Sequence, residues 1–247
     1  MTTADSTQTR NENSAGIERA LRSVVVTGGA SGLGEAVVRA VHQGGGAASA
    51  LDVRHPTGVG SQWAFVADVS DADAVEACVA RVVERRGEIT SLVCCAGIDA
   101  CGPLERVPAA SWNRVIGVNL IGVANAVRAC LPHLERSSGR IAIIASTLGL
   151  RAVPDATAYC ASKFGVVGFA RSLAVEMAGR VGVTLVIPGG MNTPFFDGRT
   201  EQYKPPPDAA LNNPADVAAT ILFALAQPPG CEVRELVVCP SRESSWP

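Results

Sequence analysis

The sequence predicts an α/β fold: one domain built on a doubly wound, mostly parallel sheet of seven strands, with helices on both faces. Short runs rich in Val, Ile and Ala alternate along the chain with longer segments of helical periodicity. The strand runs are continuously apolar, which indicates strands buried on both faces. The length of 247 residues suits one α/β domain, and the aromatic share of only 4% leaves a core of aliphatic side chains.

The expected elements follow this alternation in order. Strands are expected at 23–27, 47–52, 62–67, 90–96, 140–146, 181–187 and 234–239. Helices are expected at 32–43, 71–86, 111–136, 157–179 and 214–227. Residues 1–20 are polar without an apolar signal-peptide core, so they predict a disordered tail before a folded domain over 21–247. Prolines and polar residues in 190–213 argue against regular structure there and favour a substrate loop after a strand end.

Charge and cysteine content limit the classes of function. The formal net charge is −2 and the basic residues are scattered, so no nucleic-acid or membrane partner is predicted. The longest apolar runs are strand-length, well short of the ~20 residues that span a bilayer. The eight cysteines form no CxxC pair and the three histidines lack ligand spacing, so no metal site is predicted. Reduced thiols in a cytoplasmic protein are expected.

A glycine-rich turn, Thr-Gly-Gly-Ala-Ser-Gly-Leu-Gly at 27–34, joins the first expected strand to the first expected helix. Gly28 permits a tight turn, Gly32 lets the backbone approach a pyrophosphate, and Gly34 lets helix and strand pack closely. The free N–H groups of the helix N-terminus then face the anion. An ordinary strand–helix turn is the alternative, but the position after the first strand favours a dinucleotide site.

Asp52 ends the second expected strand, where a carboxylate can accept hydrogen bonds from the adenosine ribose. The same charge repels a 2′-phosphate, so NAD is predicted over NADP. Ser31 stands in the glycine loop where an Arg would support NADP. Arg54 could offset the repulsion by binding a phosphate, so NADP stays as the alternative cofactor.

Tyr159 and Lys163 are four residues apart in an expected helix and share one of its faces. A phenol with the ordinary pKa of ~10 is a poor base at neutral pH, and a neighbouring ammonium favours the phenolate. The pair is therefore a candidate for acid–base chemistry. Considered alone, an ordinary helix with an exposed Lys and a half-buried Tyr is the better interpretation.

Further motifs change that balance. The sequence contains five more motifs, which occur in this order along the chain: Asp68, the Cys-Ala-Gly of 95–97, Asn119, Ser146 and the PGGMNT of 188–193. Over about 22–240 the chain resembles the short-chain dehydrogenase/reductase family, in its common single-domain branch with a Rossmann fold. The resemblance implies an oxidoreductase that transfers a hydride between NAD(H) and a secondary alcohol or ketone. It also implies a homotetramer or homodimer formed through the two long helices.

The resemblance implies a role for each matching residue. Tyr159 is the general acid and base, and Ser146 orients the substrate oxygen. Lys163 lowers the pKa of Tyr159 and holds the nicotinamide ribose, while Asn119 completes a proton relay through a water held by its backbone. As alternatives, Ser146 could cap a strand end, Asn119 could be an ordinary polar helix residue, and Thr193 could cap a loop.

The implied contacts cover the rest of the site. Cofactor contacts are expected from Gly28, Ser31, Gly32, Leu33, Gly34, Asp52, Asp68, Val69, Ala96, Gly97, Tyr159, Lys163, Pro188, Gly189 and Thr193. Substrate contacts are expected from Ser146, Leu148, Val153, Tyr159, Phe195 and Phe196. The substrate end is thus expected to be largely apolar.

Position 95 departs from the family pattern, which usually has Asn-Ala-Gly after the fourth strand. That Asn supports the central sheet, and Cys95 cannot replace its amide hydrogen bonds. Either a neighbour or water compensates, or the local structure is looser. Adjacent Cys94 and Cys95 also permit a redox hypothesis, but inert packing at a buried strand end is favoured.

Alternative functions remain open at this point. Arg199 or Lys204 could bind a substrate carboxylate, since the C-terminal segment weakly resembles a branch that acts on small hydroxy acids and tends to use NADP. An NADP-dependent reductase of a small hydroxy or keto acid is therefore one alternative. A cofactor-binding protein without turnover is another, although such a protein would be expected to have lost Tyr159, Lys163 or Ser146.

Overall fold

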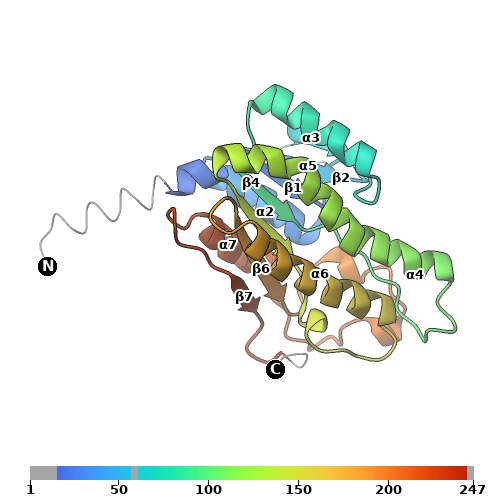
Figure 1. Ribbon diagram of the computed structural model, residues 1–247. Helices are drawn as coiled ribbons and strands as arrows, with labels where there is room; N and C mark the ends of the chain where they lie inside the picture. Colours follow the sequence, from blue (N-terminus) through green and yellow to red (C-terminus); the bar gives the residue numbers. More distant parts are fainter. Residues whose placement is uncertain (1–15, 57–60, 244–247) are drawn as a thin grey trace, which may run out of the picture.

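The computed structural model describes residues 16–56 and 61–243. One sheet holds seven strands in the order β3-β2-β1-β4-β5-β6-β7, and all neighbours are parallel (Figure 1). The strands are β1 (Val24–Thr27), β2 (Ala48–Asp52), β3 (Ala64–Val66), β4 (Ser91–Cys94), β5 (Arg140–Ile144), β6 (Gly182–Pro188) and β7 (Glu235–Val238). This is a doubly wound, Rossmann-like sheet, as predicted, and its strand order reverses between β1 and β4.

Helices follow the strands as expected. They are α2 (Gly32–Gln43), α3 (Ala72–Arg86), α4 (Ala109–Ile116), α5 (Gly122–Ser137), α6 (Thr157–Glu176) and α7 (Pro214–Leu225). The helix predicted at 111–136 is in fact α4 and α5 joined by a π-helical segment, Gly117–Ile121. Short 3₁₀ turns occur at Ser61–Trp63, Thr147–Gly149, Pro194–Phe196 and Glu201–Tyr203.

The two faces of the sheet carry separate hydrophobic cores. Side chains alternate along β1, so Val25 packs into one core while Val24 and Val26 pack into the other. Residues of α3, α5 and α6 complete the first core, and residues of α2 and α7 complete the second (Figure 1). Burial of these aliphatic side chains is the main drive for folding, and it leaves the carboxyl edge of the strands open for loops.

Helices α4 and α5 and the segment between them form one continuous helix of 29 residues, Ala109–Ser137. By length and composition this helix could cross a membrane, in contrast to the expectation that every apolar run is strand-length. Core helices meet the same criterion. Here Val118, Val123, Val127 and Leu134 are buried in the core on one face of the sheet. The apolar side chains of this helix therefore pack against the sheet.

Three local features differ from the sequence predictions. Residues 16–21 are helical, and Ala20 is buried with its carbonyl accepting from Ser91 Oγ at 2.8 Å, so order begins inside the expected tail. The rest of that tail, 1–15, lies outside the described residues. The strand predicted at 62–67 is shortened by a 3₁₀ turn at its start. The segment 190–213 contains two 3₁₀ turns rather than none.

Candidate active site

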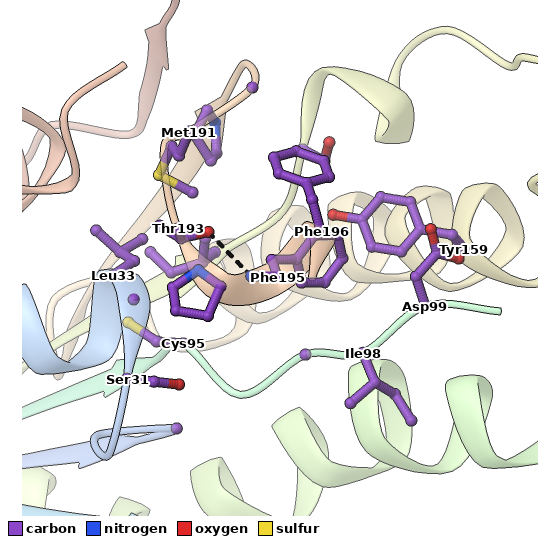
Figure 2. Close-up of a pocket in the computed structure, with 18 of the residues that line it drawn as sticks. Ser31, Leu33, Cys95, Ile98, Asp99, Tyr159, Met191, Thr193, Phe195 and Phe196 are labelled. Carbon is purple, nitrogen blue, oxygen red and sulfur yellow. Dashed lines mark hydrogen bonds between the residues drawn. The ribbon is translucent and has the colours of Figure 1, made fainter. Parts of the chain in front are cut away.

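A cavity of about 1130 Å³ runs along the carboxyl edge of the sheet, over the point where the strand order reverses. Its walls come from the glycine loop and from the segments that follow β2, β3, β4, β5 and β6. Figure 2 shows part of this lining around the loop that carries Thr193 and Phe195. Every residue expected to contact cofactor or substrate lines the cavity, while Asn119 does not.

The glycine loop is tightly packed at one end of the cavity. Gly28 has a φ of +69°, and a Cβ on it would lie 2.8 Å from Ala96 Cα. A Cβ on Gly34 would lie 2.1 Å from the carbonyl oxygen of Gly28. Ser31 is the N-cap residue of α2, and its side chain makes no capping hydrogen bond. The N–H groups in the first turn of α2 therefore remain available to an anion.

Asp52 is held rigidly beside this loop. Its Oδ2 accepts from the Ala30 N–H and its Oδ1 accepts from the Arg54 N–H, both at 3.0 Å, and only 8% of the residue is exposed. The Arg54 side chain turns toward the glycine loop and donates from Nη2 to Ser31 Oγ at 2.9 Å. Asp52, which disfavours NADP, and Arg54, which could favour it, therefore lie at the same end of the cavity.

Asp68 and Val69 form the neighbouring wall. Hydrogen bonds from the side chain and backbone of Ser70 lower the pKa of Asp68, so this carboxyl is ionised. Arg114, from α4, reaches the same wall with Nη2 3.7 Å from Asp68 Oδ2. Arg114 has no sequence motif that marks it, because only the packing of α4 brings it to this loop.

The C-terminal segment also reaches the cavity, which the sequence motifs did not indicate. Arg242 and Glu243 line it, and Glu243 Oε2 accepts from the Gly190 N–H at 3.0 Å. A Cβ on Gly189 would lie 2.1 Å from that carboxylate oxygen. The chain end thereby supports the Pro188–Gly189 wall from behind.

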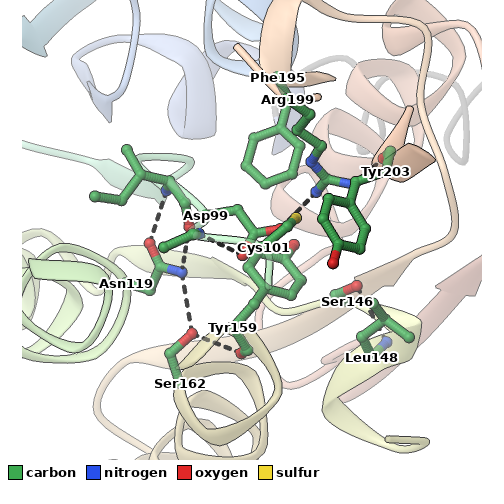
Figure 3. A network of polar contacts seen from close by, with 12 residues as sticks. Asp99, Cys101, Asn119, Ser146, Leu148, Tyr159, Ser162, Phe195, Arg199 and Tyr203 are labelled. Carbon is green, nitrogen blue, oxygen red and sulfur yellow. Dashed lines mark hydrogen bonds and ion pairs between the residues drawn. The ribbon is translucent and has the colours of Figure 1, made fainter. Parts of the chain in front are cut away.

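Ser146, Tyr159 and Lys163 meet at the other end of the cavity. Ser146 begins the turn after β5, where its Oγ accepts from the Leu148 N–H at 3.1 Å (Figure 3). Its side chain also hydrogen-bonds Tyr159. Lys163 is one helical turn beyond Tyr159, with Nζ 5.6 Å from the centre of the phenol ring. That Nζ donates to the Ile144 carbonyl at 2.9 Å, and only 5% of the lysine is exposed.

Burial has the largest effect on the pKa values of this group. Burial raises the pKa of Tyr159 to about 12, against the opposing effects of the Ser146 hydrogen bond and the Arg199 charge. Burial lowers the pKa of Lys163 to about 8. In this structure Lys163 Nζ donates to the Ile144 carbonyl, and the groups that lower the pKa of Tyr159 are Ser146 and Arg199, so the expected effect of Lys163 on that pKa stays a prediction. Tyr159 is therefore a neutral phenol at neutral pH.

Asn119 is fully buried in the π-helical segment behind the cavity wall. Its Oδ1 accepts from the Ile98 N–H at 2.8 Å, and its Nδ2 donates to the Ile98 carbonyl at 2.9 Å and to Ser162 Oγ at 3.0 Å. Ser162 Oγ in turn donates to the Tyr159 carbonyl at 2.7 Å (Figure 3). The amide thus fastens the segment after β4 to α6, and short π-helical segments often occur at functional sites.

Replacing Asn119 with Ala is expected to lower the free energy of unfolding by about 2–4 kcal/mol, because the buried groups of Ile98 and Ser162 lose their partner. Denaturant unfolding measures the loss. The matched control is Asn125→Ala, since that amide makes one hydrogen bond, to the Val69 carbonyl at 3.0 Å. Equal losses for the two variants would contradict the fastening role of Asn119.

Cys95 occupies the position at which the family usually has Asn. The turn is held by Thr27, whose carbonyl accepts from the Cys95 N–H and whose Oγ1 accepts from the Ala96 N–H, both at 3.2 Å. Burial raises the pKa of Cys94 to about 12 and raises that of Cys95 as well. Both thiols therefore stay protonated, and all eight cysteines are free, which does not favour the redox hypothesis.

Phenylalanine side chains from the loop after β6 form the substrate end. The rings of Phe195 and Tyr159 have centroids 5.7 Å apart, and Phe196 packs edge-on against Phe195. Thr193 Oγ1 accepts from the Phe195 N–H at 3.4 Å, so this threonine does cap the turn (Figure 2). It also lies close to Gly32, where an added Cβ would be 3.3 Å from Thr193 Cβ, and Leu148 and Val153 complete the apolar lining.

Neither cation suggested for a substrate carboxylate is free. Arg199 lines the cavity, but its Nη2 lies 2.6 Å from Asp99 Oδ2. Lys204 is outside the cavity wall, and its Nζ lies 2.6 Å from Glu201 Oε1. The structure therefore does not favour binding of a carboxylate by either side chain.

The cavity has a nucleotide-binding end and an acid–base end, and it lies at the switch point of a parallel sheet. This combination defines the class of dehydrogenases with a Rossmann fold. The comparison with protein families agrees: residues 22–204 match the model described as short chain dehydrogenase. The chain belongs to this family. It is therefore an oxidoreductase of CH–OH and keto groups from a family that binds a nicotinamide cofactor.

Curated relatives cover most of the chain. A 3-oxoacyl-[acyl-carrier-protein] reductase of Thermotoga maritima is 33% identical over 216 residues, 81% of this chain and 88% of the relative. A 2-dehydro-3-deoxy-L-rhamnonate dehydrogenase (NAD(+)) of a Sphingomonas species is 38% identical over 185 residues, 71% of this chain and 74% of the relative.

Two solved structures with the same fold come from archaea. The ligand-free aldohexose dehydrogenase of Thermoplasma acidophilum has a TM-score of 0.80 at 26% identity, covering 90% of this chain and 94% of its own. The alcohol dehydrogenase of Thermococcus sibiricus, complexed with 5-hydroxy-NADP, has a TM-score of 0.78 at 25% identity and covers 88% of this chain and 95% of its own.

Proposed function

We propose that this chain transfers a hydride between NAD(H) and a secondary alcohol or ketone, with Tyr159 as the general acid and base. The main support for this proposal is one continuous cavity, which extends from the glycine loop and Asp52 to Ser146, Tyr159 and Lys163. The residues fit the cofactor, since the uncapped N-terminus of α2 suits a pyrophosphate. A Cβ at Gly34 would collide with the backbone of Gly28, so the tight glycine loop requires glycine at this position. When bound, the nicotinamide supplies or accepts the hydride.

In the reduction direction, Tyr159 donates its proton to the oxygen of the developing alkoxide. The burial that raises its pKa to about 12 keeps the phenol protonated at neutral pH and ready for this step. Ser146 hydrogen-bonds the Tyr159 side chain, and its hydroxyl is placed to hold the substrate oxygen beside that phenol. Phe195, packed on the Tyr159 ring, helps to exclude water from the transfer.

In the oxidation direction, Tyr159 accepts the proton of the alcohol and must first lose its own. Positive charge beside the phenol favours the phenolate. We assign this charge to Lys163, which is cationic in most molecules below a pH of about 8. Lys163 also holds the nicotinamide ribose in this proposal, and the backbone of Asn119 in its π-helical turn holds the relay water.

We assign NAD as the preferred cofactor because Asp52 is fixed at the ribose end by two backbone hydrogen bonds and cannot turn away from a 2′-phosphate. The side chain of Arg54 is engaged by Ser31, so its use for a phosphate requires rearrangement. The relatives point both ways: the Sphingomonas enzyme is named with NAD(+), and the Thermococcus structure contains 5-hydroxy-NADP.

Asp52→Asn is expected to raise kcat/KM with NADPH by about tenfold and to lower it with NADH by a similar factor, because the repelling charge and a ribose acceptor are lost together. Steady-state kinetics with both cofactors measures the change. Asp68→Asn is the matched control: it removes a carboxylate from the adjoining wall and is expected to weaken both cofactors alike. A wild-type enzyme that prefers NADPH would refute the assignment.

The experiment that tests the proposed function is a panel of secondary alcohols and ketones, followed by the absorbance of NADH. Turnover of at least one substrate class, abolished in Tyr159→Phe, is expected. Cofactor binding without turnover of any substrate would instead support a cofactor-binding protein.

We further propose a homo-oligomer, a tetramer or a dimer, in the cytoplasm. The long helices leave apolar side chains at the surface, with Ile121 48% exposed, Phe164 45% and Val175 78%, and such side chains suit contact with a second copy. Light scattering after size-exclusion chromatography tests the assembly. The free cysteines support a reducing compartment.

A further inference from the structure

Asp99 and Arg199 form an ion pair across the substrate end of the cavity, and both line it. Nη2 of Arg199 lies 2.6 Å from Oδ2 of Asp99, and the two side chains are only 18% and 6% exposed. In seven other ion pairs of the described residues, one side chain is half exposed or more. Charges at a buried pair interact more strongly than charges at the surface.

The partners of Asp99 hold it in place on its own loop. Its Oδ1 accepts from the Ala100 N–H at 2.7 Å, and its Oδ2 accepts from Cys101 Sγ at 3.1 Å in addition to Arg199 (Figure 3). This geometry belongs to the segment directly after β4, which Asn119 fastens to α6 through Ile98. Asp99 is therefore a rigid acceptor rather than a mobile surface carboxylate.

Arg199 is held from the opposite loop. Its guanidinium carbon lies 5.1 Å and 4.7 Å from the ring centres of Phe195 and Phe196, and Nη1 donates to the Tyr203 carbonyl at 3.2 Å. Its Nε is buried with no hydrogen-bond partner. The guanidinium thus cannot leave Asp99 for a new anion without breaking several contacts of this loop.

The pair also lies at the reacting centre. Phe195, on which the guanidinium packs, is in ring contact with Tyr159, and the charges of Asp99 and Arg199 both act on the Tyr159 hydroxyl in opposite directions. A substrate whose reacting carbon approaches Tyr159 therefore meets this pair with the neighbouring part of its structure.

We propose that Asp99 determines specificity by neutralising Arg199, so that the pocket takes keto or hydroxy substrates whose nearby substituent is uncharged. This rests on the proposed function of the same site. A substrate carboxylate beside the reacting carbon must either displace Asp99 from Arg199 or be repelled by the negative charge of Asp99 in a buried site. An ester, amide or alkyl group at the same place avoids both penalties. Arg199 is then a positioning residue for the Phe195 loop.

The test compares 2-, 3-, 4- and 5-oxo acids with their methyl esters, in wild type and in Asp99→Asn. Wild type is expected to favour the esters. The isosteric Asn removes the charge that neutralises Arg199, so the ratio of kcat/KM for acid over ester is expected to rise by about tenfold or more for at least one chain length. A ratio that stays within about twofold of wild type, or a wild type that prefers the acids, overturns the proposal.

Two controls locate the effect. Glu201→Gln frees Lys204 on the same loop but outside the cavity, and it is expected to leave the ratio unchanged. Asp99→Asn combined with Arg199→Met removes the freed cation, so the gain for acids is expected to vanish. A gain in Glu201→Gln, or one that persists in the double variant, shows that Arg199 is not the group that Asp99 neutralises.

A further variant keeps the proposal testable if Asp99→Asn does not fold. Arg199→Met alone leaves Asp99 unpaired, and the ratio for acid over ester is expected to fall below that of wild type; an unchanged or higher ratio overturns the proposal. Ester turnover that depends on Tyr159 with no shift in these ratios refutes the role of Asp99 and leaves the proposed function standing. No turnover of acid or ester by wild type overturns the role of Asp99, whereas the proposed function is refuted only if the panel of secondary alcohols and ketones is not turned over either.

Discussion

Tyr159→Phe is expected to lower kcat/KM by about 10²–10⁴-fold, the usual contribution of a positioned acid–base group. The substitution removes one oxygen and keeps the ring that packs against Phe195 with centroids 5.7 Å apart. The fold and the affinity for NADH are therefore expected to change little. Steady-state kinetics, together with a binding titration of the cofactor, measures both quantities.

The chain supplies a matched control, because Tyr203 is its other tyrosine. The Tyr203 hydroxyl donates to Asp155 Oδ2 at 2.9 Å, outside the cavity wall, and its contact with Arg199 uses the backbone carbonyl. Tyr203→Phe is therefore expected to keep kcat/KM within about threefold of wild type. Equal losses in the two variants would show that the phenol of Tyr159 has no special part in the reaction.

The pH dependence of the two directions should differ. Burial raises the pKa of Tyr159 to about 12, so the phenol that reduction needs is present throughout the neutral range. Oxidation needs the phenolate, whose population rises with pH until the pKa is passed. Alcohol oxidation is therefore expected to accelerate from neutral to alkaline pH while ketone reduction does not. A reduction rate that rises with pH in the same way would contradict the assignment of Tyr159.

Gly34→Ala is expected to weaken cofactor binding by more than about 100-fold and to lower the free energy of unfolding by about 2–4 kcal/mol. The new Cβ would lie 2.1 Å from the Gly28 carbonyl oxygen and 2.6 Å from its carbonyl carbon. Both are backbone atoms, so the methyl group can be accommodated only if the glycine loop moves away from α2. Isothermal titration with NADH and denaturant unfolding measure the two losses.

Gly198→Ala provides the same chemical change in open space, since no atom lies within 4 Å of the Cβ position. Cofactor affinity and stability are expected to stay near those of wild type. If Gly34→Ala instead binds NADH as tightly as this control, the close packing of the glycine loop is not what positions the pyrophosphate.

Local sequence patterns predicted most of the architecture. The helix expected at 32–43 matches α2, because it begins within the glycine loop after Ser31 and ends before Gly44, and both limits are visible in the sequence. The residues at strand ends were also placed correctly around the cavity, since parallel strands bring their carboxyl ends to one edge. The helix expected at 111–136 was less accurate, because no spacing rule marks the π-helical turn at Asn119.

The cofactor end of the site was more predictable than the substrate end. Gly28, Gly34 and Asp52 act through backbone geometry next to one strand or turn, and short motifs encode such geometry. The substrate end depends on which loops meet. Arg199 was considered for a substrate carboxylate, yet it pairs with Asp99, a residue 100 positions away.

By itself, the sequence determined the doubly wound parallel fold, the glycine loop that opens α2, and the placing of Tyr159 and Lys163 one helical turn apart. These features depend on periodicity and on short spacings along the chain. Only the tertiary structure decided that Lys163 bonds the Ile144 carbonyl and that Asp99 neutralises Arg199. Such pairings depend on burial and on loops that meet in space, and a charged group removed from water takes the nearest partner that packing provides.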